Sequence, residues 1–384
     1  MMRVVQIGPY PESADCIRGG VEASVFGLAQ EQGKSMEVHV FDLPRMGVKS
    51  TVNRDGNVTV HRFTNSGKRQ VSMVGQVGRI VQEIVLLKPD ICHIHGTSLF
   101  AWLMLRGLSK ENLSVLVTIH GLICVEKRNQ LKARFSLKRF AQYVYQGLVE
   151  KRLLRQLRVA IVDTEYVKQM ISRYPIRRKP QMYVIPQGIS EDFFALNCSQ
   201  ESHVLLSVGA MGSRKGHLLT LEAFERLRRE GVEAELIVAG TIAEQGYYER
   251  ILQFVRNSDY KDSIHVMTNL PQQQLLELYE KAQVFVLHTE EESQGIVFAE
   301  AMAAGLPVVS TKVGGVPYII KQNKCGFLSE YGDVHAYQEN IKTVLEDARQ
   351  WQYMSMESKK CASAYRWSII NNRIMELYQS IIDK

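Results

Sequence analysis

Short runs rich in Val and Ile alternate with stretches of helical spacing along the 384 residues of the chain. Several runs are continuously apolar, which is typical of parallel strands covered by helices on both faces. This alternation predicts an α/β fold with doubly wound parallel sheets. The expected strands are residues 3–8, 37–42, 58–63, 90–95, 114–120, 160–163, 182–186, 204–209, 234–240, 263–266, 284–288, 307–310 and 326–328. Helices are expected between these strands, for example residues 20–32 and 71–87 in the first half of the chain. In the second half they are residues 217–230, 247–257, 272–281 and 295–304.

The length of the chain exceeds what one ordinary core requires and suits two domains. The alternation of strand and helix patterns is interrupted over residues 185–202, which include Pro186 and Gly188, and it resumes at His203. We therefore predict two Rossmann-like domains that face each other across a cleft, with ligands at the carboxyl ends of the strands. The predicted boundaries are 1–186 for the first domain, 187–202 for a linker, 203–365 for the second domain and 366–384 for a C-terminal helix that crosses back.

Composition places the chain among globular proteins, because 45% of its residues are apolar and only 23% are charged. The six cysteines are scattered without a C-x-x-C pair, so neither a disulfide framework nor a zinc cluster is predicted. This pattern indicates a reducing compartment. The first apolar run ends at Gly8, as a core strand does and a signal peptide does not. We expect a cytoplasmic protein, either soluble or peripheral to a membrane.

Positive charge is concentrated in the first half of the chain. Residues 1–200 hold 28 Lys and Arg against 16 Asp and Glu, whereas residues 201–384 hold 19 against 24. Between positions 127 and 158 Glu150 is the only acidic residue, and apolar residues recur there at roughly helical spacing. Two interpretations stay open: a solvated helix surface, or a basic amphipathic surface that binds anionic lipid headgroups. No motif supports nucleic acid as a partner. The basic residues are Lys127, Arg128, Lys132, Arg134, Lys138, Arg139, Lys151, Arg152, Arg155 and Arg158.

The segment ESQGIVFAEAMAAGLPVV, which begins at Glu292, carries the strongest functional signal. A buried strand precedes it, and a helix is expected to begin near Gly295 and to end at Gly305, which suits a left-handed C-terminal cap. Gly295 lets a ligand approach the backbone closely. The first amides of this helix, at Ile296 and Val297, then point at the ligand together with the positive end of the helix dipole. The junction therefore predicts a diphosphate site.

Two carboxylates flank this junction, Glu292 in the loop and Glu300 just over one turn into the helix. Their separation argues against a dyad that shares one proton. They are placed to hold the two ends of an extended ligand, because a carboxylate accepts hydrogen bonds from vicinal hydroxyls. The alternative is a solvated acidic helix start at residues 290–292, which the helix dipole favours in any case.

The segment resembles the signature of glycosyltransferase family 4, whose members are retaining enzymes of the GT-B fold. Six further segments resemble motifs of the same family, and the resemblance extends over nearly the whole chain. They are GGVE from Gly19, VG…RKG over 208–216, VIPQGI from Val184, VGGVP and GD between 313 and 333, and RWS from Arg366.

The resemblance implies roles for the residues of the junction. Glu300 would accept hydrogen bonds from the ribose hydroxyls, and Glu292 would contact hydroxyls of the donor sugar. Gly295, Ile296 and Val297 would hold the diphosphate through their amides.

The resemblance also implies that the segment after the strand 204–209 binds phosphate. Gly209 would let the phosphates approach, and Lys215 would neutralise the charge of the leaving group. The family often has an arginine where this chain has Ala210, and Arg214 is a candidate to replace it.

In the first domain the resemblance implies that Gly19 and Gly20 close over the phosphates and that His120 lies near the reacting sugar. His120 follows a strand and precedes a glycine, so a structural histidine is the alternative. His93 and His95 alternate on one strand, but no third ligand can be named, so no metal site is predicted.

These signals together predict a metal-independent glycosyltransferase without a cofactor, whose donor is a nucleoside diphosphate sugar. The resemblance implies that the transfer is retaining. A UDP-sugar is favoured over a GDP-sugar. The predicted acceptor is a glycan or a lipid-linked glycan in bacterial polysaccharide or lipopolysaccharide biosynthesis, at the inner face of the cytoplasmic membrane. Two alternatives stay open: a nucleotide-sugar epimerase of the same architecture, and a nucleotide-sugar-binding protein without catalysis.

Overall fold

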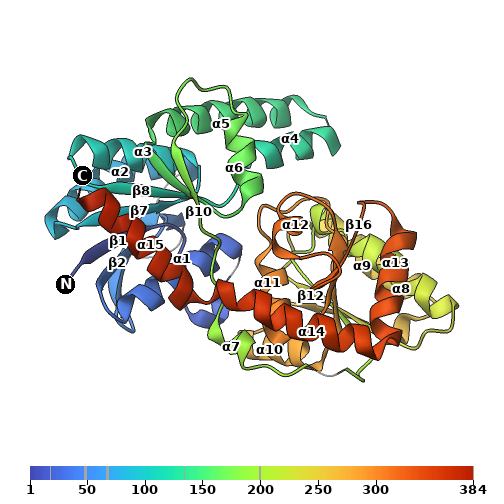
Figure 1. The fold of residues 1–384 in the computed structure, drawn as a ribbon. Coiled ribbons are helices and arrows are strands. Elements are labelled where there is room, and N and C mark those ends of the chain that lie inside the picture. Colours follow the sequence, from blue (N-terminus) through green and yellow to red (C-terminus); the bar gives the residue numbers. More distant parts are fainter. Residues whose placement is uncertain (18, 47–49, 66–68, 134, 199, 384) are drawn as a thin grey trace. The chain divides into compact units, whose positions relative to one another are not determined.

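The computed structural model describes residues 1–17, 19–46, 50–65, 69–133, 135–198 and 200–383. The chain divides into two compact units (Figure 1). The first unit comprises Met1–Glu12, Gly19–Gln187 and Trp367–Lys384, and the second comprises Ser13–Arg18 and Gly188–Arg366. Each unit is described by itself.

The first unit is built on a sheet with the strand order β10-β9-β8-β7-β1-β2-β5-β4 among the described residues. Every pairing in this sheet is parallel except that of β4 with β5, which is antiparallel. A short parallel pair, β3 with β6, lies outside it. The strands are β1 (Arg3–Ile7), β2 (Glu37–Phe41), β3 (Arg45–Met46), β4 (Thr51–Asp55), β5 (Val58–Arg62), β6 (Thr64–Asn65), β7 (Ile91–His95), β8 (Val115–Ile119), β9 (Val159–Val162) and β10 (Gln181–Val184).

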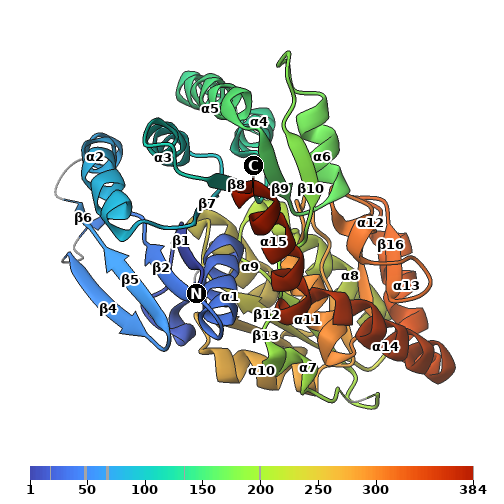
Figure 2. The same cartoon turned by 60° about the vertical axis from the view of Figure 1, so that its left-hand side comes forward.

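Helices cover both faces of this sheet, as continuously apolar parallel strands require. On one face α1 and α15 pack side by side over the sheet (Figure 2). Both helices contribute apolar residues to the core there, such as Leu28 and Ile374. On the other face α2, α3, α5 and α6 contribute to a second core, which includes Ile84, Met104 and Leu153. The helices are α1 (Gly20–Gly33), α2 (Arg69–Leu87), α3 (Leu99–Lys110), α4 (Ile123–Ala133), α5 (Leu137–Gln156), α6 (Glu165–Ser172) and α15 (Trp367–Ile382).

The second unit is built on an entirely parallel sheet with the order β13-β12-β11-β14-β15-β16 among the described residues. Helices α7, α10, α11 and α12 pack on one face, and α8, α9 and α13 pack on the other. The strands are β11 (Val204–Val208), β12 (Glu235–Gly240), β13 (Ile264–Thr268), β14 (Val284–Val286), β15 (Val308–Thr311) and β16 (Gly326–Ser329). The helices are α7 (Glu191–Phe194), α8 (His217–Arg229), α9 (Gln245–Asn257), α10 (Gln272–Lys281), α11 (Ile296–Ala304), α12 (Val316–Ile319), α13 (Val334–Glu346) and α14 (Ala348–Ala362).

The prediction of an α/β fold with two doubly wound parallel sheets is confirmed. All the expected strands and helices are present with small shifts at their ends. The sequence analysis did not identify β4, the antiparallel edge strand. Its central residues Val52, Asn53 and Arg54 are exposed, so it lacks the apolar run that marks the buried strands.

The chain passes from the first unit to the second between Gln187 and Gly188. Residues 187–202, predicted as a linker, contain α7, whose Phe193 is buried in the core of the second unit. Ile189 donates a backbone hydrogen bond of 2.9 Å to Tyr365, so the first and last segments of the range Gly188–Arg366 are joined to each other.

The basic segment of the first unit forms the helices α4 and α5. Arg134, one of its predicted basic residues, lies outside the described residues. Among the helices of the described ranges, none combines the length and the apolar character that crossing a bilayer demands.

Candidate functional site

The strand order of the second unit places a candidate site at the carboxyl ends of β11 and β14. β11 pairs with β12 on one side and with β14 on the other, so the direction in which strands are added reverses there. Open parallel sheets bind ligands at such a switch point. The loops that follow these two strands carry Lys215 and Glu292.

Two glycines position Lys215 after β11. Gly216 has a φ of 64°, and a Cβ at this position would lie 1.9 Å from the carbonyl oxygen of His288, so only glycine fits. Gly209 packs against the Lys215 side chain, and a Cβ there would lie 3.3 Å from Cδ of Lys215. The lysine stem therefore lies against the backbone of Gly209, and Gly216 sets the turn that follows it.

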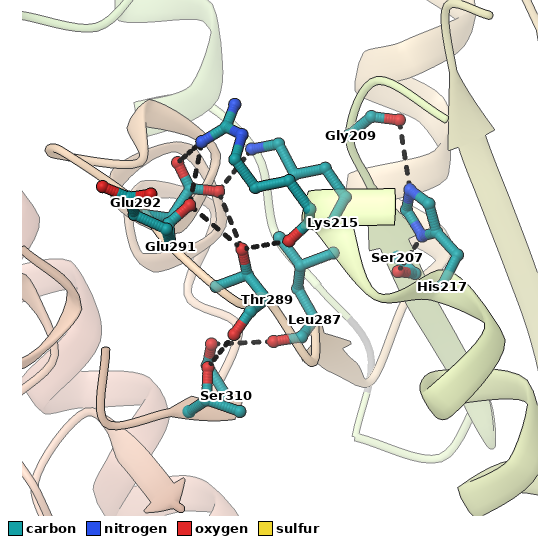
Figure 3. A network of polar contacts seen from close by, with 11 residues as sticks. Ser207, Gly209, Lys215, His217, Leu287, Thr289, Glu291, Glu292 and Ser310 are labelled. Carbon is teal, nitrogen blue, oxygen red and sulfur yellow. Dashed lines mark hydrogen bonds and ion pairs between the residues drawn. The ribbon is translucent and has the colours of Figure 1, made fainter. Parts of the chain in front are cut away.

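A buried ion pair joins the two loops, as Figure 3 shows. Nζ of Lys215 lies 2.5 Å from Oε1 of Glu292, and their side chains are 12% and 6% exposed. Arg214, which is more exposed, reaches Oε2 of Glu292 at 3.5 Å and donates to the carbonyl of Glu291 at 2.8 Å. Burial disfavours the charged form of Glu292, but the charges of Lys215 and Arg214 outweigh it and lower the pKa of this carboxyl. Glu292 is therefore ionised at neutral pH.

The loop that carries Glu292 is held in place by contacts with the segments around Arg214 and Gly315. Oγ1 of Thr289 lies 3.2 Å from Oε1 of Glu292 and 3.1 Å from the carbonyl oxygen of Arg214. The amide of Gly315 donates to the carbonyl of Glu292 at 2.7 Å. A Cβ on Gly314 would lie 2.1 Å from that same carbonyl. The carboxylate is therefore preorganised, which a site for charged ligands requires.

His217 anchors the start of α8 beneath Lys215. Its ring is fully buried, with Nε2 3.3 Å from the carbonyl of Gly209 and Nδ1 3.1 Å from Oγ of Ser207 (Figure 3). Burial lowers the pKa of His217 to about 4, although the Gly209 carbonyl opposes that shift. The ring is therefore neutral and donates from Nε2, which makes it a structural support for the lysine loop.

Helix α11 begins at the predicted junction. Gly295 is its N-cap with a φ of 84° and offers no side-chain cap, and Gly305 ends the helix with a φ of 91°. The first turn of a helix leaves its amides without intrahelical acceptors, and here these are the amides of Ile296 and Val297. Most other residues of α11 are buried, so the helix is held rigidly by the core. Its start can hold an anion such as a diphosphate.

Glu300 lies on the second turn of α11 and accepts a hydrogen bond of 3.1 Å from the hydroxyl of Tyr279. Burial raises the pKa of Glu300 to about 7, although Tyr279 and the charge of Lys215 oppose the shift. The charge of Lys215 thus acts on both carboxylates, Glu292 and Glu300. The structure brings the predicted residues of the second unit into one electrostatic cluster.

The predicted residues of the first unit lie at the start of α1 and in the loop after β8. Gly19 is the N-cap of α1 and Gly20 its first residue, and a Cβ on Gly19 would meet no atom within 4 Å. His120 follows β8 and is buried, with Nδ1 3.0 Å from Oδ2 of Asp163 and Nε2 3.1 Å from Nδ1 of His95. Both ring nitrogens of His120 are thus engaged within the first unit.

The sequence analysis missed His217, Thr289, Tyr279 and Asp163. For His217 a signal was available, because it opens α8 directly after the Lys215-Gly216 turn. Tyr279 and Asp163 contact residues 21 and 43 positions away, and no local pattern marks such contacts.

Two family models match the chain. Residues 18–193 match "Glycosyltransferase Family 4", and residues 188–361 match "Glycosyl transferases group 1". A curated relative, sulfoquinovosyl transferase SQD2 of Arabidopsis thaliana, is 25% identical over 79% of this chain, and the match spans 59% of the length of the plant protein.

Solved structures share the fold at low sequence identity. Sucrose-phosphate synthase from Thermosynechococcus elongatus superposes with a TM-score of 0.80 at 18% identity, over 100% of both chains. Anabaena Alr3699/HepE, solved in complex with UDP-glucose, superposes with a TM-score of 0.75 at 17% identity, over 99% of this chain and 100% of its own. Because the two family models together span residues 18–361 and the fold is that of GT-B enzymes, the chain belongs to glycosyltransferase family 4.

Proposed function

We propose that the protein transfers a sugar from a nucleoside diphosphate sugar to an acceptor hydroxyl. The observation that carries this proposal is the Lys215–Glu292 ion pair beside the start of α11 at the switch point of the second unit. Cleavage of the bond between sugar and diphosphate develops negative charge on the departing phosphate. The Lys215 ammonium and the first amides of α11 are fixed before the reaction, so they stabilise that charge without reorganising.

The donor that we propose is a UDP-sugar. The structure of HepE with UDP-glucose supports this choice, because the two chains share a fold over nearly their whole length. Glu300 would accept hydrogen bonds from the ribose, and Ile296 and Val297 would hold the diphosphate. Arg214 would supply the charge of the arginine that is absent at Ala210, since it already reaches Glu292.

We propose further that the transfer retains the anomeric configuration and needs no metal ion or other cofactor. The family resemblance supports retention, in which the acceptor oxygen attacks from the face that the diphosphate leaves and the departing phosphate accepts the acceptor proton. Lys215, Arg214 and the start of α11 supply the positive charge that a metal ion brings in other enzymes. Under this proposal the rate persists in excess EDTA, and proton NMR shows the donor configuration in the product.

A thermal-shift series tests the proposed donor directly. UDP and UDP-glucose are expected to raise the melting temperature, because a ligand at 100 times its Kd that binds only the folded state adds about 2.7 kcal/mol. GDP and GDP-mannose are expected to shift it less, and ATP serves as a control for unspecific anion binding. Equal shifts with ATP and UDP, or no shift with any nucleotide, would contradict the proposal.

The acceptor that we propose is a glycan or lipid-linked glycan in bacterial polysaccharide or lipopolysaccharide biosynthesis, at the inner face of the cytoplasmic membrane. The surface of α5 supports this proposal. A stripe of apolar side chains along this helix is 40–79% exposed, and Val149 and Leu153 face the core on the opposite side. The stripe consists of Leu137, Phe140, Val144, Tyr145 and Leu148.

Basic residues border this stripe. Lys138 lies on the first turn of α5, beside the stripe. Arg152 and Arg155 continue the line of the stripe toward the end of the helix. All three side chains are exposed. An apolar stripe bordered by cations matches an anionic membrane surface, in which the apolar chains enter the interface and the cations pair with headgroups. Glu150 holds α5 in this orientation, because its buried carboxylate accepts hydrogen bonds from Thr97 and from the amide of Cys124.

Replacing Leu137, Phe140 and Leu148 together by Ser is expected to abolish co-sedimentation with phosphatidylglycerol vesicles. Each side chain contributes about 1 kcal/mol or more of interfacial burial, so the affinity should fall by about 100-fold. Leu86→Ser is the matched control, since Leu86 is an exposed leucine on α2. Equal sedimentation of the triple variant and the control would contradict the proposed surface, as would binding that does not weaken in salt.

A further inference from the structure

A chain of buried polar side chains crosses the first unit and ends on the C-terminal helix α15. All its members are at most 8% exposed, and each contacts the next within hydrogen-bond distance. They come from β1, α1, β7, β8, α15 and the loops after β8 and β9. The members are Asp163, His120, His95, Gln6, Gln32, Tyr378, His93 and Thr118.

At the Asp163 end of this series of side chains, the direction of the hydrogen bonds is fixed. Oδ2 of Asp163 lies 3.0 Å from Nδ1 of His120 and 2.5 Å from Nε2 of Gln187. A carboxylate only accepts hydrogen bonds, so Nδ1 of His120 carries a proton that points at Asp163. Asp163 thereby sets the orientation of the His120 ring.

The hydrogen bonds at the other end of this series of side chains determine whether Nε2 of His120 carries a proton. The amide nitrogen of Gln6 lies 2.7 Å from Oε1 of Gln32 and 3.1 Å from the hydroxyl of Tyr378, so its carbonyl oxygen accepts from Nε2 of His95 at 2.7 Å. Burial, together with the neighbouring His93 and His120, lowers the pKa of His95 well below its ordinary value, and this ring is neutral. Its Nδ1 therefore has no proton and accepts one from Nε2 of His120.

The same contacts also permit hydrogen bonds in the reverse direction, if the amide oxygen and nitrogen of both Gln6 and Gln32 exchange places. His95 would then donate from Nδ1, and His120 would hold one proton only. That arrangement leaves the buried Asp163–His120 pair with a net negative charge, although Asp163 still accepts hydrogen bonds from His120 and Gln187. Because a buried net charge is costly, the arrangement with two protons on His120, which is electrically neutral, is favoured.

We propose that Asp163 and His95 hold His120 as an imidazolium, and that this extra proton sets the direction of every hydrogen bond in the chain as far as Tyr378. In this state the Tyr378 hydroxyl donates to Nδ1 of His93 at 2.6 Å, and Nε2 of His93 donates to Thr118 at 2.6 Å. Asp163 acts as a positioning residue for His120. The proposal concerns the first unit alone and does not depend on nucleotide binding.

Long-range ¹H–¹⁵N correlation spectra of protein labelled with ¹⁵N-histidine test this state at pH 7.5. We expect two protonated nitrogens on His120 and a proton on Nε2 alone for both His95 and His93, assigned through single His→Gln variants. His217 serves as the internal reference for a buried neutral ring. A single proton on His120, at Nδ1, with His95 and His93 protonated on Nδ1, would overturn the proposal.

The variant Asp163→Asn tests the source of the extra proton. An amide keeps the shape of the side chain but removes its charge, so we expect His120 to lose one of its two protons and the tautomers of His95 and His93 to reverse. An imidazolium that persists in folded Asp163→Asn would show that Asp163 does not hold it. If this variant does not fold, the spectrum of the unmodified protein still decides between the two directions.

Discussion

Replacement of Lys215 by Ala is expected to lower kcat by about 10²–10³-fold, which is typical for the loss of one preorganised group that stabilises developing charge. The Lys215 ammonium lies in a buried position 2.5 Å from Glu292, and its charge also acts on Glu300. Without it the departing diphosphate faces the carboxylates Glu292 and Glu300, and Arg214 keeps its contact with Glu292 from a position that is 45% exposed. Steady-state kinetics with a UDP-sugar measures the loss.

Lys312→Ala is the matched control for this variant. Lys312 is half exposed and pairs with Glu330 at 3.7 Å, and such surface pairs contribute little. We expect its kcat to stay within about twofold of the unmodified protein, a shift well below 1 kcal/mol. Thermal unfolding of both variants separates a catalytic loss from a folding loss. The role assigned to Lys215 would be wrong if its folded alanine variant matched Lys312→Ala in kcat.

Replacement of Glu300 by Gln is expected to stabilise the protein without ligand at pH 8 and to weaken UDP binding. The folded-state pKa of Glu300 is about 7 against an ordinary value of 4.5. A raised pKa means that stability is fully present below pH 4.5 and is lost as the pH rises through about 7, because the buried carboxyl must then ionise. This cost reaches roughly 3 kcal/mol at pH 8, and a glutamine does not incur it.

The stability difference between Glu300→Gln and the unmodified protein is therefore expected to grow from pH 5 to pH 8 in urea unfolding. Glu277→Gln, at an exposed position on α10, is the control and should show no such trend. UDP affinity is expected to fall by about 10- to 100-fold in Glu300→Gln, which corresponds to the loss of hydrogen bonds to a charged acceptor. A stability difference that does not change with pH would refute the ionisation assigned to Glu300.

Local signals in the sequence were enough to predict most of the fold and the core of the candidate site. Continuous apolar runs predicted the buried parallel strands, and the pair Gly295 and Gly305 predicted both ends of α11, since each has the positive φ that glycine tolerates. Gly216, directly after Lys215, was visible for the same reason, because its φ is 64°. These features depend only on residues that are close together in the sequence, so they can be predicted from a single sequence.

Contacts between distant segments could not be predicted in this way. Glu292 was expected to contact a sugar, yet its two oxygens are within ion-pair distance of Lys215 and Arg214, 77 and 78 positions away. His120 was expected near a reacting sugar, and its engagement with Asp163 and His95 depends on three different strands meeting at one edge. Spacing along the chain does not encode the hydrogen-bond partner of a buried ring.

A crystal structure with UDP tests most directly the claim that the start of α11 holds the diphosphate. The account predicts phosphate oxygens within hydrogen-bond distance of the amides of Ile296 and Val297 and near Nζ of Lys215, with the ribose hydroxyls on Glu300. UDP bound elsewhere on the second unit, or a diphosphate that leaves those two amides unengaged, would contradict it.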